Sequence, residues 1–229
     1  MLHCLAPKRL HSNIKHDDDA SVTHYSVLYT FFHAYEKHQP GIICLHIPRR
    51  IQVLIDKHFL PCTASTMEYV QDFFTDIFSW SVFPASMLRQ LEYLLIQECG
   101  VTHVVDPCCG NAFHAFLLRT FTRLTVAASD IQLEEEAWTS MEVLDAREAV
   151  AHVETPDSTA LLLSWVDYQE LGMDLVNKFQ GRIVISVGNY DEASPDYVAL
   201  LHQRFLLLRA FVLHMPWNRT ERVNVYIKK

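Results

Sequence analysis

The sequence of 229 residues lacks several signatures that would place it in a common class of protein. It has no run of about 18 uninterrupted apolar residues, the length that a membrane span needs, and Met1 to Leu10 lacks the apolar core of a secretory signal. Its six cysteines show no C-x-x-C spacing, which excludes a zinc ribbon and a thioredoxin-type redox site. We therefore expect a reducing compartment and a cytoplasmic location.

An excess of basic residues and a metal motif are also missing. The chain has 27 acidic and 19 basic residues and a formal net charge of -8, which disfavours an extended nucleic-acid surface. Thirteen histidines occur without an H-E-x-x-H motif or a Cys/His cluster, so we expect no metal site. Half of the residues are apolar, which predicts a globular protein with a substantial core. A small molecule or a protein is the expected partner.

The N-terminal third of the sequence predicts helices without strands. Apolar residues recur at three- and four-residue spacing from Val22 to Lys37 and from Thr66 to Trp80, as in amphipathic helices. Residues 1–22 show no sustained period, so we expect an irregular start. Residues 1–80 are therefore expected to form a helical N-terminal extension or cap.

The remainder of the sequence alternates between strand-like and helical segments, which predicts βαβ units. A leucine stripe followed by Gly100 first indicates a helix over 84–98. Strands are then expected at 101–105, 124–128, 160–164 and 182–187, with a weaker one near 141–144, and helices at 112–121, 146–153, 170–179 and 196–209.

The C-terminal segments 211–215 and 222–227 read as two strands joined by a short polar turn, and are therefore antiparallel. Residues 81–229 are expected to form an α/β, Rossmann-like domain whose mostly parallel sheet ends in an antiparallel C-terminal strand.

The junction after the first strand is the most informative stretch of the chain. Asp106 ends an apolar run and is followed by Pro107-Cys108-Cys109-Gly110-Asn111 and then by a helical segment. Gly110 permits close approach of the backbone to a ligand, Asn111 tolerates a left-handed conformation, and the next helix points free N–H groups at the site. A nucleotide-like cofactor is expected here, although a glycine required only by turn geometry gives the same pattern.

The acid at this junction favours S-adenosylmethionine over NAD. A carboxylate repels a pyrophosphate but accepts hydrogen bonds from an ammonium group. NAD stays open as the alternative, because Gly110, Ala112 and Ala115 half-match the dinucleotide fingerprint. Cys108 and Cys109 follow the acid without a matching His and acid, so small turn residues explain them better than nucleophiles do.

Two further carboxylates follow predicted strands. Asp130 lies 20 residues after Gly110, the offset at which an acid reaches ribose hydroxyls; its alternative is a solvated start of an acidic loop. Asp145, before Ala146, could lie near an adenine amino group or could cap a helix.

The fourth predicted strand ends in Ser164-Trp165-Val166-Asp167-Tyr168. Because ligands of open α/β sheets bind outside the carboxyl ends of strands, this segment is expected to face the reacting centre. Trp165 and Tyr168 could stack on a planar substrate and Asp167 could orient or deprotonate a nucleophile, or the aromatic pair could simply cover the sheet end. Residues 188–191 are expected to line the opposite wall on the same argument.

From Phe78-Ser79-Trp80-Ser81-Val82 to the C-terminus, the ordered set of features resembles the class I S-adenosylmethionine-dependent methyltransferases. One branch of that family has a similar entry segment, an acidic glycine loop, a second-strand acid, a Trp-containing segment and a strand ending in Ser-Trp-Pro-Pro. The corresponding places here are held by 78–82, 106–113, Asp130, Trp138 and 164–167.

The resemblance implies methyl transfer with S-adenosylmethionine as the cofactor and an unidentified small molecule or protein as the acceptor. It implies that Asp106 contacts the methionine ammonium group, Asp130 the ribose and Asp145 the adenine, and that residues 1–80 cap the site or bind a protein partner. The cofactor-binding set is Asp106, Cys108, Gly110, Asn111, Asp130, Ile131, Asp145, Ala146 and Ser164, and the catalytic set is Trp165, Asp167 and Tyr168.

Two departures from the family pattern keep other functions open. Cys108 and Ala112 replace the flanking glycines of the loop, and Val166-Asp167 replaces the Pro-Pro. The methyl group of Ala112 is harmless if the backbone there is helical, but it weakens cofactor binding if a positive φ is needed. A catalytically inert interaction protein with this fold, and an NAD-dependent enzyme, are the alternatives.

Overall fold

The computed structural model describes residues 75, 79–132, 137–166, 170–214 and 220–229. The predicted helix at 22–37 lies outside these residues, as does nearly all of the one at 66–80. Ser79 and Trp80, which that prediction included, are not helical. Asp167 and Tyr168 also lie outside the described residues.

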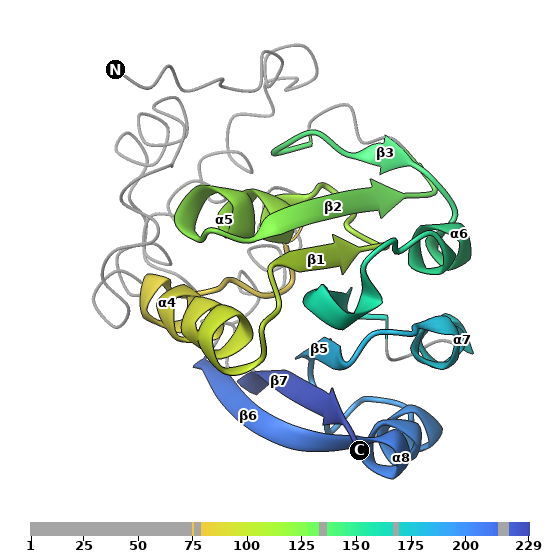
Figure 1. Cartoon of the computed structure of the whole chain (residues 1–229). Coiled ribbons are helices and arrows are strands. Elements are labelled where there is room, and N and C mark those ends of the chain that lie inside the picture. Colours follow the sequence, from red (N-terminus) through yellow and green to blue (C-terminus); the bar gives the residue numbers. More distant parts are fainter. Residues whose placement is uncertain (1–74, 76–78, 133–136, 167–169, 215–219) are drawn as a thin grey trace, which may run out of the picture. The chain divides into compact units, whose positions relative to one another are not determined.

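Seven strands form one sheet in the order β3-β2-β1-β4-β5-β7-β6 (Figure 1). The first five pair in parallel, whereas β7 runs antiparallel to both β5 and β6. The strands are β1 His103–Asp106, β2 Thr125–Asp130, β3 Glu142–Val143, β4 Thr159–Ser164, β5 Ile183–Gly188, β6 Phe205–His214 and β7 Thr220–Lys228.

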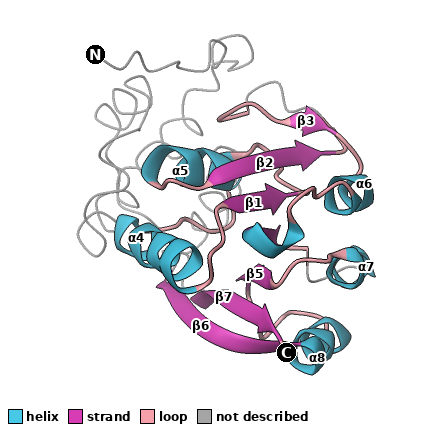
Figure 2. Cartoon of the chain, in the orientation of Figure 1, coloured by secondary structure: helices cyan, strands magenta, loops and turns pink. Residues whose placement is uncertain are grey.

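Helices cover both faces of the sheet, with α4 and α5 on one face and α6, α7 and α8 on the other (Figure 2). The second face carries a core cluster in which Leu175 of α7 and Leu201 of α8 pack against Val184 of β5. The helices are α4 Ala85–Tyr93, α5 Phe113–Phe121, α6 Ala146–Ala151, α7 Glu170–Lys178 and α8 Pro195–Arg204, with a π-helical turn η2 Leu94–Glu98 and a 3-10 turn η3 Pro156–Ser158. None of the described helices has the length and apolar character needed to cross a membrane.

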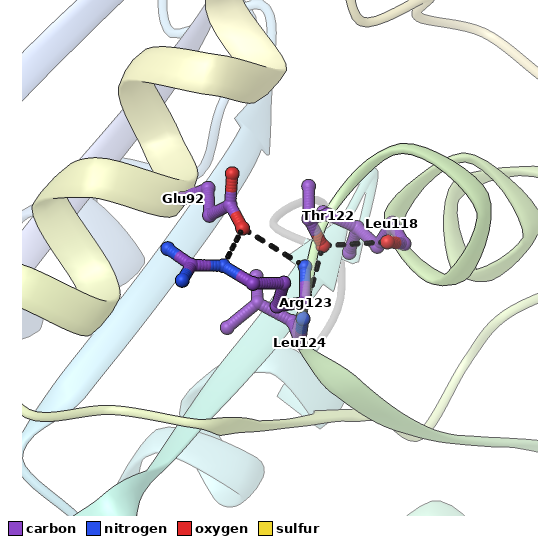
Figure 3. A network of polar contacts seen from close by, with 5 residues as sticks. All are labelled: Glu92, Leu118, Thr122, Arg123 and Leu124. Atoms are coloured by element: carbon purple, nitrogen blue, oxygen red, sulfur yellow. Dashed lines mark hydrogen bonds and ion pairs between the residues drawn. The ribbon is translucent and has the colours of Figure 1, made fainter.

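A polar network joins α4 to the connection between α5 and β2 (Figure 3). Oε1 of Glu92 accepts hydrogen bonds from the backbone N–H of Arg123 at 3.0 Å and from its Nε at 2.8 Å. The bonded Arg123 side chain holds the pKa of the Glu92 carboxyl below its usual value. Thr122 accepts from the N–H of Leu124 and donates to the carbonyl of Leu118 at the end of α5. The network thus orients α5, whose first turn faces the candidate site.

The described elements confirm the predicted alternation, with one correction near the C-terminus. The helix expected over 196–209 ends at Arg204, and Phe205 is already extended with φ of -129°. The run Phe205 to Leu208 is apolar at every position, so its periodicity suits a strand as well as a helix. Pairing with β7 selects the strand, since Leu206 lies opposite Ile227 in the register.

Candidate functional site

Asp106 ends β1 as a buried carboxylate that lacks hydrogen-bond partners within the described residues. Its side chain is 1% exposed, and neither carboxylate oxygen has a partner there. Burial, followed by the nearby charge of Asp130, raises the pKa of Asp106 to about 7, against the opposing influence of Arg119. An unsatisfied buried carboxylate is costly, so this group needs a proton or an external cationic donor.

The turn after Asp106 leaves open space beside Gly110. Gly110 has a φ of 52°, in the left-handed region that favours glycine. A Cβ atom added at Gly110 would meet no atom within 4 Å. The backbone here can therefore be approached by a ligand.

Asp130, at the end of β2, is tied to this turn. Its Oδ2 accepts a hydrogen bond from the backbone N–H of Gly110 at 2.9 Å, and its Oδ1 accepts one from the N–H of Ile131 at 2.8 Å. A carboxylate offers about four lone-pair sites, so both oxygens retain capacity for a ligand. Ile131 is 69% exposed and presents an apolar side chain next to Asp130.

Ala112 occupies a backbone conformation that usually belongs to glycine. Its φ is 59° and its side chain is fully buried. The backbone at Ala112 is therefore not in the right-handed helical conformation in which its methyl group was expected to be harmless. A left-handed non-glycine residue is also strained by roughly 1–2 kcal/mol. Asn111 supports the turn: its Oδ1 accepts from the N–H of Phe113 and its carbonyl accepts from the N–H of Trp138.

The two cysteines of the turn are thiols with a low tendency to ionise. Burial raises the pKa of Cys108 to about 12, with further contributions from the carboxylates of Asp106, Asp130 and Asp145. Burial likewise raises the pKa of Cys109. Both are free cysteines, and neither is an activated nucleophile, because the thiolate is the reactive form. The carboxylates of Asp106, Asp130 and Asp145 all lie close enough to Cys108 to disfavour its thiolate.

Asp145 caps a helix, as one of its two interpretations predicted. Its Oδ1 accepts a hydrogen bond from the backbone N–H of Arg147 at 2.8 Å, which satisfies a free donor at the start of α6. Ala146 follows it and is 8% exposed. A contact of either residue with an adenine ring stays a prediction.

The end of β4 carries Ser164, which is half-buried, and Trp165, which has a φ of 59°. The N–H of Trp165 donates to the carbonyl of Val187 at 2.8 Å, and its indole Nε1 donates to Oγ of Ser81 at 2.9 Å. The ring of Trp80 lies 5.3 Å from that of Trp165 between centroids. Strained residues of this kind cluster at functional sites.

At the end of β5, residues 188–191 form a turn held by its own side chains. Oδ1 of Asn189 accepts from the N–H of Asp191 at 3.1 Å, and its Nδ2 donates to Glu192 at 3.0 Å. Asn189 therefore closes a local turn, and the predicted role of 188–191 as a wall of the site stays a prediction.

Sequence reasoning missed a buried polar group at this edge of the sheet. Ser81 and Glu221 are both fully buried, and Oγ of Ser81 donates a hydrogen bond to Oε2 of Glu221. The two residues are 140 positions apart, and they meet because β7 is inserted beside β5. No local motif marks Glu221, which falls in the polar start of a strand.

The described residues contain no group of three or more His, Cys, Asp or Glu side chains that could hold a metal ion. A cavity of about 370 Å³ lies between α4, η2 and Arg209 of β6, and none of the predicted site residues lines it.

The order of the strands defines the class of fold. A parallel sheet with an antiparallel β7 inserted between β5 and β6 is the class I methyltransferase arrangement, whereas a dinucleotide dehydrogenase continues in parallel. The chain therefore has a class I methyltransferase-like, Rossmann-like fold.

No protein-family model and no curated protein matches the sequence. Among solved structures, the chain is similar to the N-methyltransferase NodS from Bradyrhizobium japonicum WM9 in complex with S-adenosyl-L-homocysteine. That alignment has 10% sequence identity and a TM-score of 0.45, and it covers 72% of this chain and 97% of NodS. Magnesium protoporphyrin IX methyltransferase from Synechocystis PCC 6803 with bound SAM overlaps at 13% identity, 74% and 99% of the two chains and a TM-score of 0.47. The 1,6-didemethyltoxoflavin-N1-methyltransferase of Burkholderia thailandensis overlaps at 14% identity, 83% and 94%, and a TM-score of 0.46. The fold assignment rests on the strand order rather than on these overlaps.

Proposed function

We propose that the protein transfers a methyl group from S-adenosylmethionine to an acceptor held at the carboxyl edge of the sheet. The observation that carries the proposal is Asp106, a buried carboxylate beside an open glycine turn, with Asp130 bonded to that turn. S-adenosylmethionine, when bound, supplies an electrophilic methyl group on a sulfonium sulfur.

The donor set of the edge fits the two polar ends of this cofactor. Asp106 offers two oxygens without described partners, and an ammonium group has three donors to satisfy them. Asp130 accepts hydrogen bonds from ribose hydroxyls through its remaining lone pairs, while its bonds to Gly110 and Ile131 hold the carboxylate in place. Cys108, Asn111, Asp145, Ala146 and Ser164 complete the proposed cofactor-binding set.

The acceptor lies against the end of β4 in this proposal. Trp165 provides an aromatic surface at the strand end, and Asp167 and Tyr168 follow it in the sequence. Most of the acceleration comes from alignment of the acceptor with the methyl group and from exclusion of water. Residues 1–80 are proposed to cap this edge or to bind a protein partner, and the setting is proposed to be the cytoplasm.

Calorimetry with S-adenosylmethionine, S-adenosylhomocysteine and NADH tests the proposal directly. Saturable binding of the first two, without binding of NADH, is the expected result. If neither adenosyl ligand binds at millimolar concentration, the methyltransferase proposal is wrong, and selective binding of NADH would support a dehydrogenase.

An inert interaction protein is the second candidate. The strained Ala112 in the binding turn favours it, because a chain that does not catalyse methyl transfer has no need to keep glycine there. Binding of the adenosyl ligands without methyl transfer to a broad set of acceptors would support this candidate.

A further inference from the structure

Residues 79–83 share Ser79 to Val82 with the 78–82 segment of the family resemblance, and we call residues 79–83 the entry segment from here on. They connect the proposed acceptor side of the candidate site to its proposed cofactor side. The segment precedes α4, and its Ser81 and Phe83 are fully buried. Its polar contacts reach Trp165 at the end of β4, Glu221 at the start of β7 and His114 in the first turn of α5. These elements are distant in sequence, so the segment joins parts of the fold that backbone pairing alone does not join.

Ser81 is the centre of these contacts. Its Oγ donates a hydrogen bond to Glu221 and accepts one from the indole Nε1 of Trp165 at 2.9 Å. The indole N–H can only donate, so Oγ of Ser81 accepts from Trp165 and its own hydrogen is directed to Glu221. The lone pairs of Ser81 therefore face the indole. Both hydrogen bonds of the chain Trp165–Ser81–Glu221 are donated in the same direction, from Trp165 towards Glu221.

The indole of Trp165 needs such a restraint. The backbone at Trp165 is fixed by its φ of 59° and by the hydrogen bond to Val187, but these leave the side-chain torsions free to change rotamer. The bond from Nε1 to Ser81 and the packing of Trp80 against the ring select one orientation.

His114 ties the same segment to the proposed cofactor side. Its Nε2 lies 2.8 Å from the carbonyl of Ser81 and 3.1 Å from Oγ of Ser79, and its ring stacks on Phe83 at 4.3 Å. A carbonyl only accepts, so Nε2 is assigned the proton. Burial lowers the pKa of His114 to about 4, which keeps the ring neutral at neutral pH. His114 lies in α5, two residues after Ala112 of the glycine turn.

We infer that Ser81, supported by Glu221, is a positioning residue that orients Trp165 for the acceptor. The inference rests on the proposed function for its catalytic meaning. The orientation of Trp165 itself is measurable without an acceptor.

The experiment uses the full chain with Trp165 as its single tryptophan, obtained by replacing Trp80, Trp138 and Trp217 with Phe. Fluorescence emission and acrylamide quenching are recorded for Ser81→Ala, Glu221→Ala and Glu221→Gln. Ser186→Ala is the matched control, because Ser186 is a buried serine of the same sheet whose Oγ accepts a hydrogen bond from the hydroxyl of Tyr197. Binding of S-adenosylhomocysteine is measured on each variant and on the otherwise unchanged chain.

Ser81→Ala and Glu221→Ala are expected to shift the emission to longer wavelength and to increase quenching by about twofold or more. The first variant removes the acceptor of the indole N–H, and the second removes the group that holds the Ser81 hydroxyl in place. Glu221→Gln is expected to stay near the parent, because an amide oxygen still accepts from Ser81. Affinity for S-adenosylhomocysteine in Ser81→Ala is expected to stay within about threefold, a change below about 1 kcal/mol.

A Trp165 spectrum in Ser81→Ala that matches Ser186→Ala would overturn the inference. So would equal effects of Glu221→Gln and Glu221→Ala, since the retained hydrogen bond would then have no role. Failure of the unchanged chain to bind S-adenosylhomocysteine would instead overturn the proposed function, and with it the catalytic meaning of Ser81.

Discussion

The backbone N–H of Gly110 donates a hydrogen bond to Oδ2 of Asp130 at 2.9 Å. This bond joins the turn after β1 to the end of β2, so the two predicted site segments form one unit. The pKa of Asp106 depends on the same pair of segments, because the charge of Asp130 contributes to raising it. The carboxylate of Asp130 therefore lies close enough to Asp106 to disfavour ionisation of Asp106.

Replacement of Asp130 is expected to weaken cofactor binding more than it weakens the fold. Asp130→Ala removes a charged hydrogen-bond acceptor, worth about 1.5–3 kcal/mol, so affinity for S-adenosylhomocysteine should fall by about 10- to 150-fold. Asp130→Asn keeps one acceptor oxygen and should lose less. Calorimetry gives both values. Asp157→Ala is the control, because Asp157 is exposed and precedes β4 at the opposite edge of the sheet; an equal loss there would contradict a local role for Asp130.

Gly110 and Gly100 form a matched pair for the open space beside the turn. Both have positive φ values, 52° and 68°, and a Cβ added to either meets no atom within 4 Å. Alanine at each position should therefore cost roughly 1 kcal/mol of stability through left-handed strain. Only Gly110→Ala should also reduce affinity for S-adenosylhomocysteine, by about tenfold or more, because steric overlap with a bound ligand costs more than about 1.4 kcal/mol. Thermal unfolding and calorimetry separate the two effects, and equal affinities for the two variants would remove Gly110 from the site.

Ala112→Gly tests whether the altered glycine pattern impairs the site. Glycine relieves roughly 1–2 kcal/mol of left-handed strain, but it loses about 0.8 kcal/mol of methyl burial and adds roughly 0.5–1 kcal/mol of unfolded-chain entropy. These effects nearly cancel, so the free energy of unfolding in urea should change by less than about 1 kcal/mol.

The methyl group of Ala112 is fully buried and does not project into solvent. Because the positive φ of Ala112 is the conformation in which its methyl group was expected to weaken cofactor binding, affinity of Ala112→Gly for S-adenosylhomocysteine should rise, but by no more than about threefold, or about 0.7 kcal/mol. A gain of tenfold or more would mean that Ala112 disables the site, and would favour the inert interaction protein.

The pKa of Asp106 predicts a specific pH dependence. In the folded chain it is raised to about 7 from its ordinary 3.8, so the folded state binds a proton that the unfolded state has lost between these values. The free energy of unfolding should therefore fall as pH rises from about 4 to about 7 and stay low above that, by an amount on the order of 4 kcal/mol.

Asp106→Asn removes this titration. Urea unfolding at pH 5 and pH 8 should show the variant gaining stability relative to the parent by a few kcal/mol at the higher pH. The parent should bind S-adenosylhomocysteine more weakly below pH 7, because Asp106 must ionise to accept the ammonium group, and the variant should lose that dependence. Parallel stability profiles for the two proteins would contradict the assigned pKa.

Much of the fold was predictable because its signals are local. Val104 and Val105 before Asp106 indicate a buried strand, and the helix and strand alternation that follows predicts a parallel sheet. The segment 205–209 was predicted wrongly, since its leucines suit either period and only pairing with β7 decides between them.

The sequence by itself determined the βαβ alternation, the acid and glycine turn at 106–110 and the acid at Asp130, because strand length, apolar spacing and turn chemistry act over a few residues. The tertiary structure alone decided that Ser81 meets Glu221 and Trp165, and that Ala112 takes a left-handed conformation. These features depend on the insertion of β7 beside β5 and on packing between segments that are distant in the sequence. Neither produces a hydrophobic periodicity or a motif spacing that could be recognised in the sequence.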